Sequence, residues 1–239
     1  MARISLREYN HEIENLITQD RYDQAIDHCR HILQSFPRHI HTYQLLGKAF
    51  LESQRYSDAA DILQRVLSSI PEDFVAHIGM SMIRQDEGNL DAAVWHMERA
   101  FEQQPANSAI QDELRNLYAR RSGQEPPKVR LTRGALARMY FKGELYQQAS
   151  AELRAALAED PERLDLLALL SESYFKEDKK VEAAETSSQL LQKLPNSLVG
   201  NRVLSKILEG SERAEESKVY HQRVMALDPY HCLLYTSDA

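Results

Sequence analysis

The chain has 239 residues, 43% of them hydrophobic and only 8 of them glycine, and it carries a formal net charge of −7. This acidic balance argues against general attraction to nucleic acid, and two cysteines are too few for the disulfide framework of a secreted protein. No apolar run approaches the ~20 residues that cross a membrane, and the first ten residues lack the apolar segment of a secretory signal. We therefore expect a cytoplasmic protein that binds neither membrane nor nucleic acid.

Six of the eight prolines stand at a regular interval. Pro37, Pro71 and Pro105 are evenly spaced, and the same spacing separates Pro161, Pro195 and Pro229. A fixed period of about 34 residues indicates that one structural unit is repeated. Because proline lacks an amide hydrogen and its ring clashes with the preceding turn, each of these prolines is expected to follow the end of a helix.

Each period predicts two helices. The position twelve residues before the proline is small in every unit, and it holds Ala25, Ala59, Ala93, Ala149, Ala183 and Ser217. Apolar residues five and eight positions before the proline mostly continue this stripe, which predicts the second helix of the unit. An earlier apolar pattern, clearest at Tyr43, Leu46 and Phe50, predicts the first helix, and turn formers such as Gly88-Asn89 separate the two.

The first array is predicted at residues 6–121. It contains three units, at 6–39, 40–73 and 74–107. Residues 108–121 continue the pattern as a single helix, and no second helix follows it. We interpret this helix as a cap on the array, because terminal repeats need a solvated outer face.

A linker and a second array follow. Residues 122–131 contain Pro126-Pro127 and should be extended and free of helix. The linker is either a passive connector or a hinge or docking loop recognised as a polyproline segment. The second array is predicted at residues 130–231, with units at 130–163, 164–197 and 198–231.

The joint recurrence of spacing, alanine, turn and proline resembles the tetratricopeptide repeat (TPR) family, whose unit is a helix–turn–helix of about 34 residues. The resemblance implies an all-α fold, a right-handed α–α superhelix in which the first helix of each unit lines a concave groove. It also implies a non-catalytic scaffold or adaptor that binds a peptide or helix in that groove. Neither array reproduces the family's clamp for a terminal carboxylate, so that activity is not transferred.

The repeat register proposes residues that face the groove: Lys48, Arg138, Phe141, Lys142, Phe175, Lys176, Arg202 and Lys206. Five of these are cations of the second array, interleaved with two phenylalanines, in an otherwise acidic protein. Concave walls of low dielectric would concentrate their potential. One hypothesis is therefore an acidic partner segment with an aromatic or aliphatic anchor. The alternative is a solvated face with ordinary ion pairs, to Asp165 and Glu172 among others.

Nothing in residues 1–231 indicates catalysis. The chain contains no glycine-rich phosphate loop, no GxSxG and no HExxH. His28 and His31 lie one helical turn apart near Cys29, but the fuller zinc spacings are missing, and a surface histidine face explains them better. We predict no enzyme activity, no cofactor and no metal site, and a protein or peptide as the partner.

The last eight residues, 232–239, read CLLYTSDA. This octapeptide matches the translation of an adapter used in sequencing libraries, so we expect it to be non-native and the natural chain to continue differently. The alternative is a genuine tail in which Tyr235 begins a seventh unit. On the first interpretation Leu204, Leu208 and Val224 would lack a covering neighbour, and unit 198–231 would fray. The chain could then be the regulatory or targeting part of a larger enzyme or sensor, or a self-association module.

Overall fold

The computed structural model describes residues 5–124 and 128–230, and within these residues it contains helices and no strand. The helices are α1 (Leu6–Thr18), α2 (Tyr22–Ser35), α3 (Ile40–Glu52), α4 (Tyr56–Ser69), α5 (Phe74–Asp86), α6 (Leu90–Gln103), α7 (Ser108–Ser122), α8 (Arg133–Lys142), α9 (Tyr146–Glu159), α10 (Leu164–Lys176), α11 (Lys180–Lys193), α12 (Leu198–Glu209) and α13 (Ala214–Leu227). The Pro126-Pro127 pair and the segment 232–239 lie outside the described residues.

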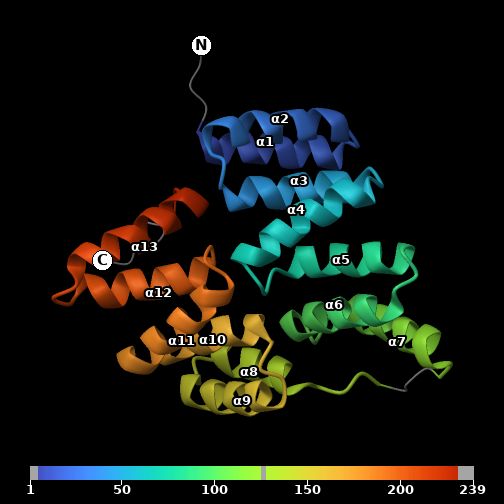
Figure 1. The fold of residues 1–239 in the computed structure, drawn as a ribbon. Helices are drawn as coiled ribbons and strands as arrows, with labels where there is room; N and C mark the ends of the chain where they lie inside the picture. The colour runs from blue at the N-terminus through green and yellow to red at the C-terminus, as the bar shows by residue number, and fades with distance from the viewer. Residues whose placement is uncertain (1–4, 125–127, 231–239) are drawn as a thin grey trace.

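The helices form pairs that repeat along the chain, which confirms an all-α solenoid of helix–turn–helix units (Figure 1). The first array comprises α1 to α6 in three pairs together with the single helix α7, and the second array comprises α8 to α13. None of the described helices combines the length and apolar character that a bilayer crossing needs.

The turn inside five of the six pairs contains one residue in the left-handed backbone region. Gly88 adopts it in the third unit with φ 75°, and the same position holds Asp20, Gln54, Glu144 and Asp178 with φ between 58° and 59°. Glycine adopts this region without a steric cost, whereas the other residue types pay a modest one. In the fourth unit Glu144 takes this conformation and Gly143 does not, although the sequence would favour the glycine.

Small residues allow the two helices of a unit to approach closely. Every alanine at the repeated position of the second helix is fully buried. On the opposing helix, a Cβ added at Gly47 would lie only 2.6 Å from Cδ2 of Leu63. In the last unit Ser217 replaces alanine and donates a hydrogen bond of 2.8 Å to the carbonyl of Ser205 on α12, so the close approach is kept with a polar residue.

The expectation that the last unit leaves apolar side chains uncovered is wrong. Leu204, Leu208 and Val224 are 4%, 8% and 2% exposed. Within this unit α12 and α13 pack closely, and the hydroxyls of Ser205 and Ser217 lie 3.4 Å apart.

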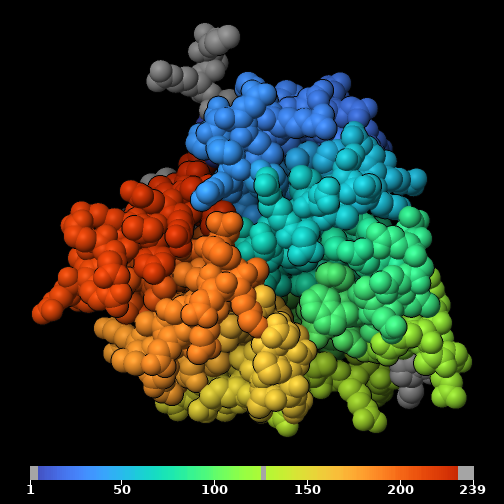
Figure 2. Space-filling model, viewed as in Figure 1, coloured from blue at the N-terminus to red at the C-terminus, as the bar shows by residue number. Residues whose placement is uncertain are grey.

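The two arrays lie side by side. Helices α1 to α7 run down one side of the molecule, and α8 to α13 return along the other (Figure 1). As a result α8 packs against α6 rather than continuing the stack beyond α7. At the other end the last unit meets the first, where the guanidinium of Arg7 lies 5.7 Å from the ring centre of Tyr230. Figure 2 shows the atoms of the last unit bordering those of the first two units.

Candidate protein-binding surface and the seam between the arrays

Three of the proposed groove cations gather on the second array. Lys176 lies at the end of α10, and Arg202 and Lys206 lie one turn apart on α12. Partial burial lowers the pKa of Lys206, and the charges of Arg202 and Lys176 lower it further. The three cations therefore lie close together. We call these three residues the cationic face. Phe175 is half-buried beside Lys176 and packs against the core of the second array.

The cationic face already binds one carboxylate. Glu172 on α10 accepts a hydrogen bond of 2.5 Å from Nη2 of Arg202, and both side chains are partly exposed. This pair leaves Lys176 and Lys206 exposed on the same surface.

Three other proposed residues lie elsewhere. Lys142, at the end of α8, is exposed and donates a hydrogen bond of 3.0 Å to the carbonyl of Gln103 on α6. Phe141 meets the ring of Tyr146 edge-on at 5.4 Å. Lys48 is exposed on α3 and belongs to the first array.

Arg138 differs from the expectation of an exposed groove residue. It is only 5% exposed, and its Nη2 donates a hydrogen bond of 2.8 Å to Oδ2 of Asp165 on α10. The physical reason is the docking of the first array, which covers this part of α8. The repeat register cannot reveal this cover, because it describes one array at a time.

A cluster of charged and polar side chains lies where the first array covers α8. We call this cluster the inter-array seam, and its residues are Glu102, Thr132, Arg138, Arg163 and Asp165. Arg163 donates from Nη2 to Oε2 of Glu102 at 2.5 Å and from Nε to Oδ1 of Asp165 at 2.8 Å. Thr132, the N-cap of α8, donates to Oε1 of Glu102 at 2.8 Å. A carboxylate from α6 is thereby held by residues of the second array.

The charges of the seam stabilise one another. Burial opposes the charge of Asp165, but its hydrogen bonds with Arg163 and the charges of Arg163 and Arg138 hold its pKa well below the usual range. Burial likewise opposes the charge of Arg163. The carboxylates of Asp165 and Glu102 outweigh this effect and raise the pKa of Arg163. Pairing of this kind is what permits ionised groups to remain in an interior.

Glu72, in the turn between α4 and α5, is a second carboxylate that the first array brings to this junction. Its main-chain carbonyl accepts a hydrogen bond of 2.8 Å from Gln103. Burial raises the pKa of its side chain to about 7; Arg138 lowers it, and Asp165 and Glu172 raise it. Among the described residues, Oε2 of Glu72 and Nε of Arg138 find no hydrogen-bond partner.

Comparison with known proteins identifies the repeat. The Tetratricopeptide repeat family matches residues 16–82 and again residues 135–197, which together make up more than half of the chain. The chain belongs to the tetratricopeptide repeat family. No curated protein matches it.

Solved structures of other TPR proteins resemble the fold at low sequence identity. MamA (AMB-1) is 18% identical, with 78% of this chain and 96% of that chain covered and a TM-score of 0.38. YrrB, described as a TPR protein with an unusual peptide-binding site, is 13% identical, with 81% and 89% covered and a TM-score of 0.44. The APC/C hetero-tetramer Cut9-Hcn1 is 15% identical, with 94% and 47% covered and a TM-score of 0.42. These scores carry no argument about the site.

The TPR chain also places an aromatic cluster at the seam that sequence reasoning missed. Nε2 of His77 lies 2.9 Å from the carbonyl oxygen of Pro71 and so must carry a hydrogen. Nδ1 of neutral His77 then accepts from Nδ1 of His96, 3.0 Å away. Trp95 packs against both rings, and the guanidinium of Arg99 lies 4.5 Å from the Trp95 ring centre. No periodic signal marks this cluster, because its histidines and tryptophan come from both helices of a unit.

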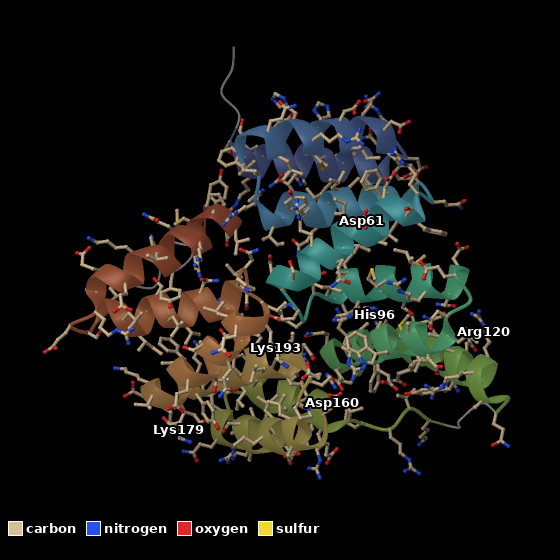
Figure 3. All side chains as sticks on the ribbon, viewed as in Figure 1. Asp61, His96, Arg120, Asp160, Lys179 and Lys193 are labelled. Atoms are coloured by element: carbon tan, nitrogen blue, oxygen red, sulfur yellow. The ribbon has the colours of Figure 1, made fainter. Side chains whose placement is uncertain are left out.

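This cluster borders a cavity of about 260 Å³ between the arrays. Trp95, His96 and His77 face Leu164 and Leu194 of the second array across it. Figure 3 shows His96 on α6 and Lys193 at the end of α11 on the two sides of the seam. Burial and the neighbouring His77 lower the pKa of His96 to about 3, and burial also lowers the pKa of His77, so both rings are neutral near pH 7.

A larger cavity, of about 600 Å³, lies between the first two units and the last unit of the TPR chain. Its lining includes Asn10, Glu14, His41, Asp228 and Tyr230. Within residues 5–124 and 128–230, no group of three histidine, cysteine, aspartate or glutamate side chains is arranged to hold a metal ion. His28 instead bonds through Nδ1 to the hydroxyl of Tyr9 at 2.7 Å.

Proposed function

We propose that this TPR protein is a scaffold that binds an acidic peptide or helix on the concave side of its second array. The observation that carries the proposal is the cationic face, where Lys176, Arg202 and Lys206 converge beside half-buried Phe175. Because the whole chain is acidic, with a formal charge of −7, this face is a local exception. Complementary potentials of this kind favour partner choice and fast association more than tight binding.

The pairing of Arg202 with Glu172 supports the chemical class of the partner. It shows that the face can hold a carboxylate at hydrogen-bond distance while neighbouring Lys176 and Lys206 keep their side chains exposed. Phe175 offers an apolar contact next to these charges. A partner segment that combines aspartate or glutamate with one aromatic or aliphatic side chain therefore matches the surface.

The test is a charge reversal at the face. A fluorescein-labelled peptide of glutamates around a central phenylalanine would be titrated with the wild-type protein and with Lys176→Glu/Arg202→Glu, and anisotropy would be measured. We expect the dissociation constant to rise at least roughly tenfold, equivalent to about 1.4 kcal/mol. Binding by the wild type should also weaken between low and high salt, because exposed charges are screened.

A matched control reverses two exposed cations away from the face, Lys180→Glu/Arg213→Glu, which lie at the start of α11 and just before α13. This variant has the same net charge change, and its affinity should stay within about twofold of the wild type, since exposed charges outside the face are screened. Equal losses in both double variants would mean that only net charge matters. That result, or unchanged binding by the first variant, would contradict the proposed site.

A further inference from the structure

The repeat register singles out Arg138 as a residue that should be exposed. Arg138, Glu172 and Lys206 are spaced by one repeat period each and occupy the same position of the first helix in three successive units. Glu172 and Lys206 are partly or fully exposed, whereas Arg138 is buried. The difference comes from the first array, which brings Glu72 and Glu102 to the first unit of the second array.

The two carboxylates are bound very differently. Glu102 is fully engaged, with Arg163 on one oxygen and Thr132 on the other. Glu72 lies within the field of Arg138 but leaves one oxygen without a hydrogen bond, and Nε of Arg138 is also left without one. Buried groups without partners make a contact less stable than a fully paired one. The contact between the arrays therefore contains one stabilising and one destabilising carboxylate.

We propose that the inter-array seam is a latch that withholds Arg138 from the second-array groove and releases it when the arrays separate. In the closed state Arg138 bonds to Asp165 beneath the first array. In the open state it joins Lys176, Arg202 and Lys206 on the same side of the second array. The latch itself stands on the contacts at the seam, and its effect on partner binding rests on the function proposed above.

Glu102 holds the latch closed. Its carboxylate bridges α6 to Arg163, at the start of α10, and to Thr132, at the start of α8, so it joins the first array to two units of the second. Gly134 permits this, because a side chain there would collide with the carboxylate of Glu102. Replacing Glu102 by glutamine removes the charge that Arg163 binds and should favour the open state.

Glu72 works in the opposite direction and makes the latch sensitive to pH. Its carboxylate feels the charge of Arg138 on α8 and the charges of Asp165 and Glu172 on α10. Asp73 follows Glu72 in the turn, but its side chain caps α5 and accepts a hydrogen bond from Gln44. His77 and Arg99 of the first array lie near the same Arg138–Asp165 pair.

The sign of the pH effect follows from burial. Enclosure raises the pKa of Glu72 from 4.5 to about 7 in the closed state, and exposure on opening returns it toward 4.5. Between these values the closed state binds more protons than the open state. A rise in pH through this window therefore favours opening, and the full effect is present above pH 7.

Trp95 provides a native reporter. It is the only tryptophan of the chain, it is 44% exposed, and it borders the cavity that α6 shares with Leu164 and Leu194 of the second array. Separation of the arrays removes these neighbours from its ring. Its emission should then move to longer wavelength, and acrylamide should quench it more strongly.

The experiment records Trp95 emission and the radius of gyration by X-ray scattering from pH 5.5 to 8.5. It compares the wild type with Glu72→Gln, Glu102→Gln and the control Glu12→Gln, an exposed residue of α1. We expect a red shift and a larger radius with rising pH in the wild type and the control. Glu72→Gln should stay closed at every pH, and Glu102→Gln should be open at every pH.

A wild type whose emission and radius do not change with pH, or a Glu72→Gln variant that follows the wild type, would overturn the latch. If Glu102→Gln loses helical content in circular dichroism, the comparison of the wild type with Glu72→Gln decides the question alone. Because His77 and His96 are present in all four proteins, their titration cannot produce the difference between variants.

Binding of the labelled acidic peptide separates the latch from the proposed function. At pH 6, Glu102→Gln should bind the peptide several-fold more tightly than the wild type, because Arg138 becomes available. Equal affinity in an opened protein would overturn the regulatory role of the latch. Absence of binding in every protein would instead contradict the proposed function, and the fluorescence and scattering data would still decide whether the latch exists.

Discussion

At the scale of single residues, this protein encloses several ionisable side chains. Their states follow from their partners and their burial. Asp165 remains charged because two arginines bind it. His77 and His96 remain neutral because burial lowers the pKa of both rings, and the neighbouring His77 lowers that of His96 further. Cys29 is buried without a charged partner, and burial raises the pKa of its thiol to about 12. This thiol is therefore a core residue rather than a nucleophile.

His96 predicts how stability depends on acid. Its pKa is about 3 in the folded protein and about 6.5 when unfolded, so the unfolded chain binds the proton first as pH falls. The folded state should lose about 2–3 kcal/mol from this residue between pH 7 and 4.5. Urea unfolding at these two pH values should show a smaller loss for His96→Gln than for the wild type. The exposed control His31→Gln should behave as the wild type, and equal losses in all three proteins would contradict the assignment.

At the scale of elements, α7 has no helical partner of its own and packs on α6. Its apolar face buries Ile110, Leu114 and Leu117 in one cluster with Met97 and Phe101 of α6. Asn107 caps the start of α7, and Gly123 ends it in the left-handed region with φ 75°. A helix with defined ends and a polar outer face suits the end of a repeat array.

Leu114→Ala tests the contribution of α7. Leu114 is fully buried, so loss of its side chain leaves a cavity and should lower the free energy of unfolding by about 2–5 kcal/mol. Val181→Ala, at a residue of α11 that is 68% exposed, should cost little. Urea denaturation followed by circular dichroism measures both. A loss at Leu114 no larger than that at Val181 would mean that α7 is not part of the folded array.

At the scale of the whole molecule, each repeat is stabilised by its neighbours, whereas the overall shape depends on contacts between distant parts of the chain. Each unit contacts its neighbours, as expected for a solenoid. The seam adds contacts between distant parts of the chain, chief among them the Glu102–Arg163 pair. These contacts couple two arrays that have separate apolar cores.

Arg163→Ala should uncouple the arrays. At pH 6, urea unfolding of the wild type followed by Trp95 emission and by circular dichroism should coincide, because the arrays unfold together. Removal of Arg163 leaves two buried carboxylates without their main partner, which costs about 3–5 kcal/mol, and the two signals should then separate. Arg133→Ala breaks only the exposed pairs with Glu152 and Glu159 and should keep them coincident. Coincident signals in both variants would show that the seam does not couple the arrays.

Much of the fold could be predicted because its causes are local. The proline interval and the alanine stripe depend on contacts within one unit or between adjacent units, and these contacts recur in each repeat. The sequence did not indicate that Glu144 rather than Gly143 would take the left-handed conformation. The grouping of Lys176, Arg202 and Lys206 was also accessible, because it requires only the register of two neighbouring units.

The amino-acid sequence by itself determined the repeating unit, its helices, and the face of its own helix on which each side chain lies. Only the tertiary structure decided that the second array folds back on the first, that Arg138 is buried, and that Glu72 and Glu102 enter the seam. The physical reason is distance along the chain. Glu102 and Arg163 are 61 residues apart, with a linker between them, and no short-range pattern encodes the meeting of two charges at such a separation.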